Sequence, residues 1–333
     1  MSLNPAIRDC LILPAVCAPM FLVSGPQMVA EACKAGVMGG LPRQNARSLE
    51  EFEIWLRDIR AELDAYRDKN PGARIGPLAV NLSRRLAGED IDAHLAICGR
   101  YGVNIIISAT GDPTELVKRT HDWGGVVFHD VVNLRFAEKA IKAGADGLTC
   151  VGAGGGGHSG VISHLALVPR VRAMFDGVIL MAGAISTGAA IRAAEVLGAD
   201  LAYMGTRFTA TQEAPVPSAY KDLLVTQGSG DLTYTERISG VAANWMNESL
   251  RRVGLDPANL PEPGAKMSHG HLPPEVKPWK NLWSAGQGID LIEDVPTIAE
   301  LVRRLRREYV VACATPDMAD VARLVERATD TAS

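Results

Sequence analysis

Short apolar runs alternate with amphipathic stretches along the first two thirds of the chain. The runs predict eight strands, at 11–17, 37–41, 77–81, 104–108, 125–129, 147–151, 178–181 and 201–204. They are apolar almost throughout, which is typical of parallel strands that are buried on both faces. The stretches between them have the apolar spacing of helices, and the one that begins at Ser48 opens with a capping box completed by Glu51. Eight strand–helix units predict an α/β fold, the closed (β/α)8 or TIM barrel.

The alternation ends near residue 210 and divides the chain into three segments. Residues 1–210 form the predicted barrel core with the cofactor site. Residues 211–281 are rich in proline and glycine and contain helix-like pieces at 218–226 and 241–253, so we predict a mostly helical insertion over the barrel mouth. Residues 282–333 form a return segment with closing helices at 295–308 and 316–329.

Composition excludes several classes of protein. With 333 residues, 47% hydrophobic and 22% charged, the chain is typical of a soluble globular protein. Its net charge of -4, without a basic block, argues against a nucleic-acid partner, and no apolar run approaches the ~18 residues of a membrane span. The six cysteines form no C-x-x-C pair and the N-terminus does not resemble an export signal, so we expect a cytoplasmic location. A homodimer is a further expectation, because barrels with helical additions often pair.

A glycine-rich loop follows the sixth predicted strand. Gly152 and 154–157 supply five glycines in six positions, and His158 comes next. Glycine has no Cβ, so its backbone reaches positive φ and lets another molecule approach the main chain closely. A titratable imidazole at the end of such a loop would meet a bound group. The loop therefore predicts one wall of a cofactor site.

Further candidates stand where the other strands end, because barrel enzymes carry their working residues there. These ends are Ala18-Pro19-Met20, Asn81, His129-Asp130, Ala182-Gly183-Ala184 and Gly205-Thr206. Loops after strands seven and eight commonly hold a phosphate, since free N–H groups and a helix N-terminus favour an anion. We therefore expect a phosphorylated cofactor. The glycine run matches neither a P-loop nor a dinucleotide fingerprint.

Taken together, these motifs resemble the nitronate monooxygenase family, formerly called 2-nitropropane dioxygenases. The resemblance is carried by Ala-Pro-Met at 18–20, Asn81 in VNL, GGHSG at 156–160, Gly183, MGTRF at 204–208 and WSAGQG at 283–288. It spans nearly the whole chain and keeps the order of the motifs. Two positions depart from the family pattern: Asp130 stands where some relatives have lysine, and Ala184 follows Gly183 where paired glycines are usual.

The resemblance implies FMN as cofactor and oxidation of alkyl nitronates or nitroalkanes by O2 to a carbonyl compound and nitrite. It implies that His158 is the acid/base, a role that suits a group titrating near pH 6.5. The residues that it assigns to the flavin are Ala18, Pro19, Met20, Asn81, His129, Gly156, Gly157, Ala182, Gly183, Ala184, Met204, Gly205, Thr206, Ser284, Gly286 and Gln287.

Other interpretations remain open at this point. The same scaffold serves NAD(P)H-dependent reductases of enoyl thioesters or quinones, and a barrel can also bind a phosphorylated ligand without turnover. His129 could instead satisfy backbone groups at a strand end, and Arg207 could pair with a carboxylate beneath its loop. His269 and His271 lack a third ligand, so we predict a loop there and no metal site.

Overall fold

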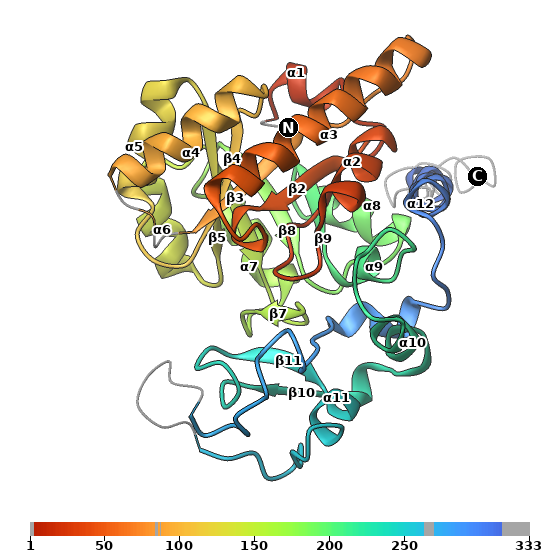
Figure 1. The fold of residues 1–333 in the computed structure, drawn as a ribbon. Helices are drawn as coiled ribbons and strands as arrows, with labels where there is room; N and C mark the ends of the chain where they lie inside the picture. Colours follow the sequence, from red (N-terminus) through yellow and green to blue (C-terminus); the bar gives the residue numbers. More distant parts are fainter. Residues whose placement is uncertain (1–2, 84–85, 87, 263–269, 315–333) are drawn as a thin grey trace, which may run out of the picture.

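The computed structural model describes residues 3–83, 86, 88–262 and 270–314. Eight parallel strands form a closed barrel in which the last strand pairs with the first (Figure 1), which confirms the predicted fold. The barrel strands are β1 Ala15–Cys17, β2 Met38–Pro42, β3 Leu78–Ser83, β4 Ile105–Ala109, β5 Val126–Val131, β6 Gly147–Val151, β8 Val178–Ala182 and β9 Leu201–Met204. Seven of them lie within two residues of the predicted bounds.

The first strand is shorter than predicted, because 11–14 precede β1 instead of belonging to it. Pro14 has no N–H to give to a ladder, although its carbonyl accepts from the N–H of Ala202 at 2.8 Å. Leu11 and Leu13 are nevertheless buried, at 6% and 1% exposure. The apolar run thus reflects the packing of Leu11 in the cluster that contains Val16 and of Leu13 in the cluster that contains Ala15, and not strand pairing.

Helices surround the barrel (Figure 1). In α3, the buried residues Phe52, Leu56, Ile59 and Leu63 recur every three or four positions, and the Ser48 side chain accepts from the Glu51 N–H as the capping box predicts. The helices of the barrel segment are α1 Pro5–Arg8, α2 Pro26–Lys34, α3 Leu49–Lys69, α4 Glu89–Arg100, α5 Thr114–Trp123, α6 Leu134–Lys142, α7 His164–Arg172, α8 Gly188–Val196 and α9 Thr206–Thr209, with the 3-10 turn η1 at Arg43–Asn45.

Side chains along the barrel strands alternate between the interior and the helices, as the period of two requires. One buried cluster fills the interior and includes Val16, Ile107, Phe128 and Leu180. Residues of the opposite parity, such as Val127, pack in other clusters against the helices. This parity decides which strand-end residues face the barrel mouth.

The insertion is less helical than predicted. Helix α10 (Ser218–Thr226) forms as expected, but the predicted helix at 241–253 is wrong in its first half. Its residues form β11 (Ala243–Met246), which pairs antiparallel with β10 (Leu232–Thr235), and only α11 (Asn247–Arg251) is helical. The Asn244 amide donates to the Gly155 carbonyl at 2.7 Å, so pairing within the insertion and with the glycine loop overrides the local helical pattern. A 3-10 turn, η2 (Ser229–Asp231), precedes β10.

The chain then returns to the barrel through η3 (Gln287–Leu291) and α12 (Ile298–Cys313), which packs against α8 and α2. Helix α12 begins and ends a few residues after the predicted 295–308. The predicted helix at 316–329 and the histidine at 269 lie outside the described residues. The division of the chain into three segments stays a prediction. Within the described part of the chain, no helix combines the length and the apolar character needed to cross a bilayer.

Candidate functional site

The glycine loop and the return segment interlock at the carboxyl end of the barrel. The Gln287 N–H donates to the Gly154 carbonyl at 2.8 Å, and the Gly286 N–H donates to the Thr206 hydroxyl at 2.8 Å. A Cβ on Gly156 would lie 2.8 Å from the Gly286 nitrogen, and one on Gly286 would lie 2.8 Å from the Gly154 oxygen. Only glycine permits this approach. The structure thereby brings together residues predicted from three separate motifs.

The strand ends of β8 and β9 form an adjoining rim. Gly183 has φ +123° and Ala184 has φ +56°, so alanine here occupies the left-handed region at a cost of about 1–2 kcal/mol. The first helical donors of α9, from Phe208 and Thr209, go to the Gly205 carbonyl. The Thr206 N–H precedes them and has no intrahelical acceptor. Ala182 and Met204, also predicted, are buried at the ends of these strands.

The loop after β1 lies against this rim. The Met20 N–H donates to Ser24 Oγ at 2.9 Å, which fixes the turn, and Met20 Sδ accepts from the Thr209 hydroxyl at 3.3 Å. A Cβ on Gly205 would lie 3.3 Å from that sulfur. Ala18 is buried and Pro19 is partly exposed. The predicted Ala-Pro-Met motif therefore contacts the β9 end directly.

Asn81 faces the barrel interior from β3. Its side chain is 8% exposed; its Nδ2 donates to the Ile107 carbonyl at 3.2 Å, and its Oδ1 accepts from Gln44 Nε2 at 2.9 Å. These two contacts fix the orientation of the amide. Gln44, which no sequence motif indicated, is thus an orienting residue that the chain places after β2.

His158 lies on the short strand β7 (Gly157–His158) and is exposed. Its ring stands edge-on to Trp279, with ring centroids 5.2 Å apart and planes at 86°. Surrounding protein atoms desolvate the imidazole and so lower the pKa of His158 below its ordinary value of 6.5. The ring is therefore neutral at neutral pH. The next residue, Ser159, ties the loop to the insertion through its N–H, which donates to the Ala242 carbonyl at 3.2 Å.

The geometry does not bring His129 together with the other predicted cofactor residues. His129 shares the parity of Val127 and faces the helices, where its Nδ1 lies 2.7 Å from Ser108 Oγ. Burial lowers the pKa of His129 to about 4, so it stays neutral. This arrangement favours the alternative interpretation, a satisfied polar residue at a strand end. The alternation of side chains along β5 is the physical reason.

Asp130 takes the inward position that His129 lacks. It follows Phe128 on the interior face of β5 and pairs in register with Thr149 of β6. Its Oδ1 is buried and has no hydrogen-bond partner among the described residues. Burial raises the pKa of Asp130 to about 7, although the Thr149 hydroxyl favours the charged form. In the sequence, Asp130 is both a strand-end candidate and a departure from the family pattern, and the alternation of side chains along β5 is the signal that separates it from His129.

Arg207 and Ser284, each next to a predicted site residue in the sequence or itself one, are held by contacts with other parts of the chain. Arg207 is 2% exposed and pairs with Asp294 at 3.0 Å, which agrees with its structural interpretation. The Ser284 carbonyl accepts from the Tyr220 hydroxyl, and Trp283 stacks on the Tyr220 ring at 5.0 Å. Throughout the described ranges, no group of three or more His, Cys, Asp or Glu side chains could hold a metal ion.

Comparison with known proteins agrees with the motifs. The sequence model of the nitronate monooxygenase family matches residues 5–308 and confirms the predicted family. A Paraburkholderia phytofirmans nitronate monooxygenase is 28% identical over an alignment that covers 89% of this chain and 92% of that protein. The structure of a nitroalkane oxidase from Streptomyces ansochromogenes superposes with a TM-score of 0.75 at 25% identity, over 92% of this chain and 99% of the other.

The chain is also similar to a dehydrogenase that is named for a CoA thioester. The (3aS,4S,5R,7aS)-5-hydroxy-7a-methyl-1-oxo-octahydro-1H-indene-4-carboxyl-CoA dehydrogenase of Rhodococcus jostii is 29% identical over 237 residues, or 71% of this chain. That match spans 63% of the dehydrogenase, slightly less than two thirds of its length. The relatives thus include nitronate monooxygenases, a nitroalkane oxidase and a dehydrogenase named for a CoA thioester.

Proposed function

Since the chain belongs to the nitronate monooxygenase family, we propose that it binds FMN and oxidises alkyl nitronates or nitroalkanes with O2 to a carbonyl compound and nitrite. The observation that carries this proposal is the position of His158. Its neutral imidazole follows directly on the glycine loop, and that loop is packed against the rim formed by the ends of β8 and β9.

The residues present fit a flavin phosphate and ring. The rim of Gly183, Ala184, Gly205 and Thr206 combines left-handed backbone with an N–H at the start of α9, which suits an anion. Gly157, at the end of the glycine loop, has φ +68° and no protein atom within 4 Å of the position that a Cβ would take, so a ring system can approach the backbone there. The residues that we propose for the ring and its surroundings are Ala18, Pro19, Met20, Asn81, Gly156, Gly157, Ala182, Met204, Ser284, Gly286 and Gln287.

When bound, FMN would supply the electron-transfer chemistry with O2, and the protein contributes position and proton transfer. The imidazole of His158 accepts the α-proton of a neutral nitroalkane. Once the imidazole is protonated, it donates a hydrogen bond to a nitronate oxygen. Because its pKa lies below 6.5, the basic form prevails at neutral pH. Trp279 contacts the ring edge-on from one side.

The test begins with the absorption spectrum of the purified protein, which should show bound flavin. Addition of propyl nitronate in air should then release nitrite. In His158→Asn, flavin should stay bound while turnover of neutral nitropropane falls by about 10²–10⁴ fold, the usual contribution of a general base. His121→Asn, at an exposed histidine on α5, serves as control. Unchanged turnover in His158→Asn would remove this residue from the mechanism.

A second candidate is NAD(P)H-dependent reduction of an enoyl thioester or quinone. The similarity to a dehydrogenase that is named for a CoA thioester substrate supports this second candidate. Anaerobic addition of NADPH distinguishes the two functions, because it bleaches the flavin of a reductase and leaves that of a nitronate monooxygenase oxidised.

A cytoplasmic location and a homodimer stay predictions. Light scattering of the purified protein would measure its oligomeric state.

A further inference from the structure

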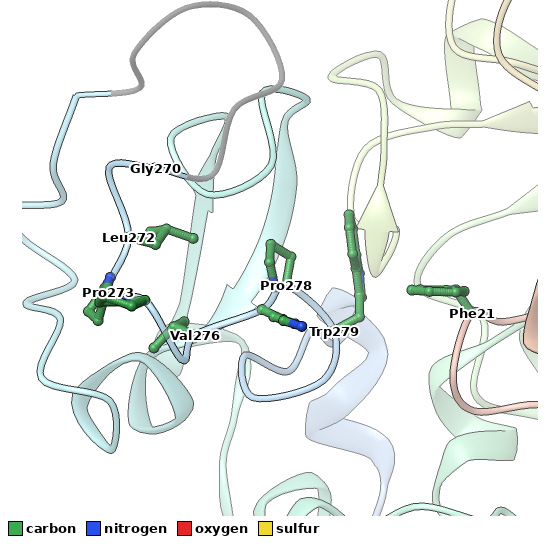
Figure 2. Close-up of a pocket in the computed structure, with 9 residues that line it drawn as sticks. Phe21, Gly270, Leu272, Pro273, Val276, Pro278 and Trp279 are labelled. Atoms are coloured by element: carbon green, nitrogen blue, oxygen red, sulfur yellow. The ribbon is translucent and has the colours of Figure 1, made fainter.

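An open cavity of about 620 Å³ lies between the loop after β1 and residues 270–279 of the insertion (Figure 2). Phe21 lines it from the barrel side, and Trp279 lines it next to His158. The remaining lining residues come from one stretch of chain: Gly270, Leu272, Pro273, Pro274, Val276, Lys277 and Pro278. Lys277, which is exposed, is the one charged side chain among these described lining residues. The cavity is therefore an apolar space beside the proposed acid/base.

Trp279 connects the cavity to His158 and is held rigidly. The N–H groups of Lys280 and Asn281 donate to the Lys277 carbonyl at 3.1 and 3.0 Å, which closes a turn around the tryptophan. The Trp279 ring also packs on the fully buried Trp245, with centroids 5.1 Å apart. Its φ of +62° is unfavourable for a bulky residue. Such strained residues cluster at functional sites, where the surrounding structure maintains them.

We propose that this cavity binds the apolar tail of the substrate, so that the preferred substrates are nitronates or nitroalkanes whose reacting carbon carries a long alkyl or alicyclic group. The reacting group is taken from the proposed function, whereas the tail is inferred from the cavity. With the reacting carbon at His158, the rest of the molecule extends past Trp279 toward Phe21 and Val276. The volume lies within the range of about 300–1,000 Å³ typical of sites for drug-sized ligands, so a propyl group would leave most of it unfilled.

The energetics give a measurable dependence on chain length. Each methylene group transferred from water into an apolar site contributes about 0.8 kcal/mol, which corresponds to a factor of about four in kcat/KM. The wild-type enzyme should therefore oxidise the nitronates of 1-nitropropane, 1-nitrohexane and 1-nitrodecane with rising kcat/KM, followed as nitrite release. Equal values for all three would overturn the proposal.

Two adjacent side chains provide a matched pair of variants. Phe21 and Leu22 are 42% and 41% exposed, but only Phe21 lines the cavity. Phe21→Ala should reduce the advantage of nitrodecane over nitropropane at least tenfold, whereas Leu22→Ala should leave that ratio unchanged. Flavin content is measured in both, so that a loss of cofactor is not read as a loss of tail binding. An equal effect of both variants on the ratio would contradict the role of the cavity.

Binding of an unreactive probe separates failure of this proposal from failure of the proposed function. Calorimetric titration of the flavin-containing enzyme should detect 1-octanol but not 1-propanol, and octanol binding should weaken at least tenfold in Val276→Asp or, if that variant does not fold, in Phe21→Ala. If no nitronate is oxidised but octanol binds in this pattern, the proposed function fails while the apolar site stands. If octanol does not bind the wild-type enzyme, the apolar site is refuted.

Discussion

Replacement of Asp130 by asparagine should stabilise the protein, and by an amount that depends on pH. The side chain faces the barrel interior, one of its oxygens is buried without a partner, and burial raises its pKa from the ordinary 3.8 to about 7. Between these two values the folded protein binds more protons than the unfolded chain. The free energy of unfolding therefore falls as pH rises through this window. Asparagine keeps the shape of the side chain and cannot ionise.

The magnitude follows from the two pKa values. They lie about three pH units apart, which corresponds to a loss of about 4 kcal/mol once the carboxyl is fully ionised above pH 7. At pH 5 only about 2 kcal/mol of this loss has developed, because pH 5 is little more than one unit above the unfolded value. The advantage of Asp130→Asn over the wild-type protein should therefore grow by about 2.5 kcal/mol between pH 5 and pH 8.

Urea unfolding of both proteins at pH 5, 6, 7 and 8 measures this difference. Flavin-free protein is used, because a bound cofactor adds its own contribution to stability. The substitution Asp176→Asn, at an exposed carboxyl, is the control and should stay within about 0.5 kcal/mol of wild type at each pH. A difference between Asp130→Asn and wild type that is the same at pH 5 and pH 8 would refute the reasoning, because it would mean that the carboxyl does not change its charge in this window.

The remaining predictions concern His129 and the glycine loop. Burial lowers the pKa of His129 to about 4, so between pH 4 and 6.5 the unfolded chain binds more protons than the folded protein, and the free energy of unfolding falls as pH falls. Between pH 7 and pH 5 this effect lowers the wild-type free energy of unfolding by about 2 kcal/mol, and His129→Gln should abolish that decrease, as measured by urea unfolding. If the free energy of unfolding depends on pH in the same way in His129→Gln and in the wild-type protein, the ring is not buried in its neutral form. In Gly156→Ala, the new Cβ would lie 2.8 Å from the Gly286 nitrogen and displace the return segment, so flavin should dissociate at least tenfold more readily, as followed by flavin fluorescence. Gly230→Ala, whose Cβ meets nothing within 4 Å, should retain flavin normally; equal loss in both variants would count against a close-packed cradle.

The periodicity of apolar residues in strands and helices was enough to predict most of the fold. Eight apolar runs at regular spacing identified the barrel strands, and Ser48 and Glu51 located the start of α3 as the structure has it. Local pattern sufficed here because a parallel barrel strand is buried on both faces and its helix on one. The pattern failed at 243–246, where β11 obtains its hydrogen bonds from β10 rather than from its own neighbours in sequence.

The sequence by itself determined the order of the motifs, the family and the set of strand ends from which a site could be built. Only the tertiary structure decided which side chains of that set face the same space. It turned His129 toward Ser108 and Asp130 into the barrel, and it carried Gly286 and Trp279 back from far along the chain to Gly156 and His158. The physical reason is that side-chain direction depends on strand register and contacts between distant segments depend on packing, and neither is encoded at the level of a local motif.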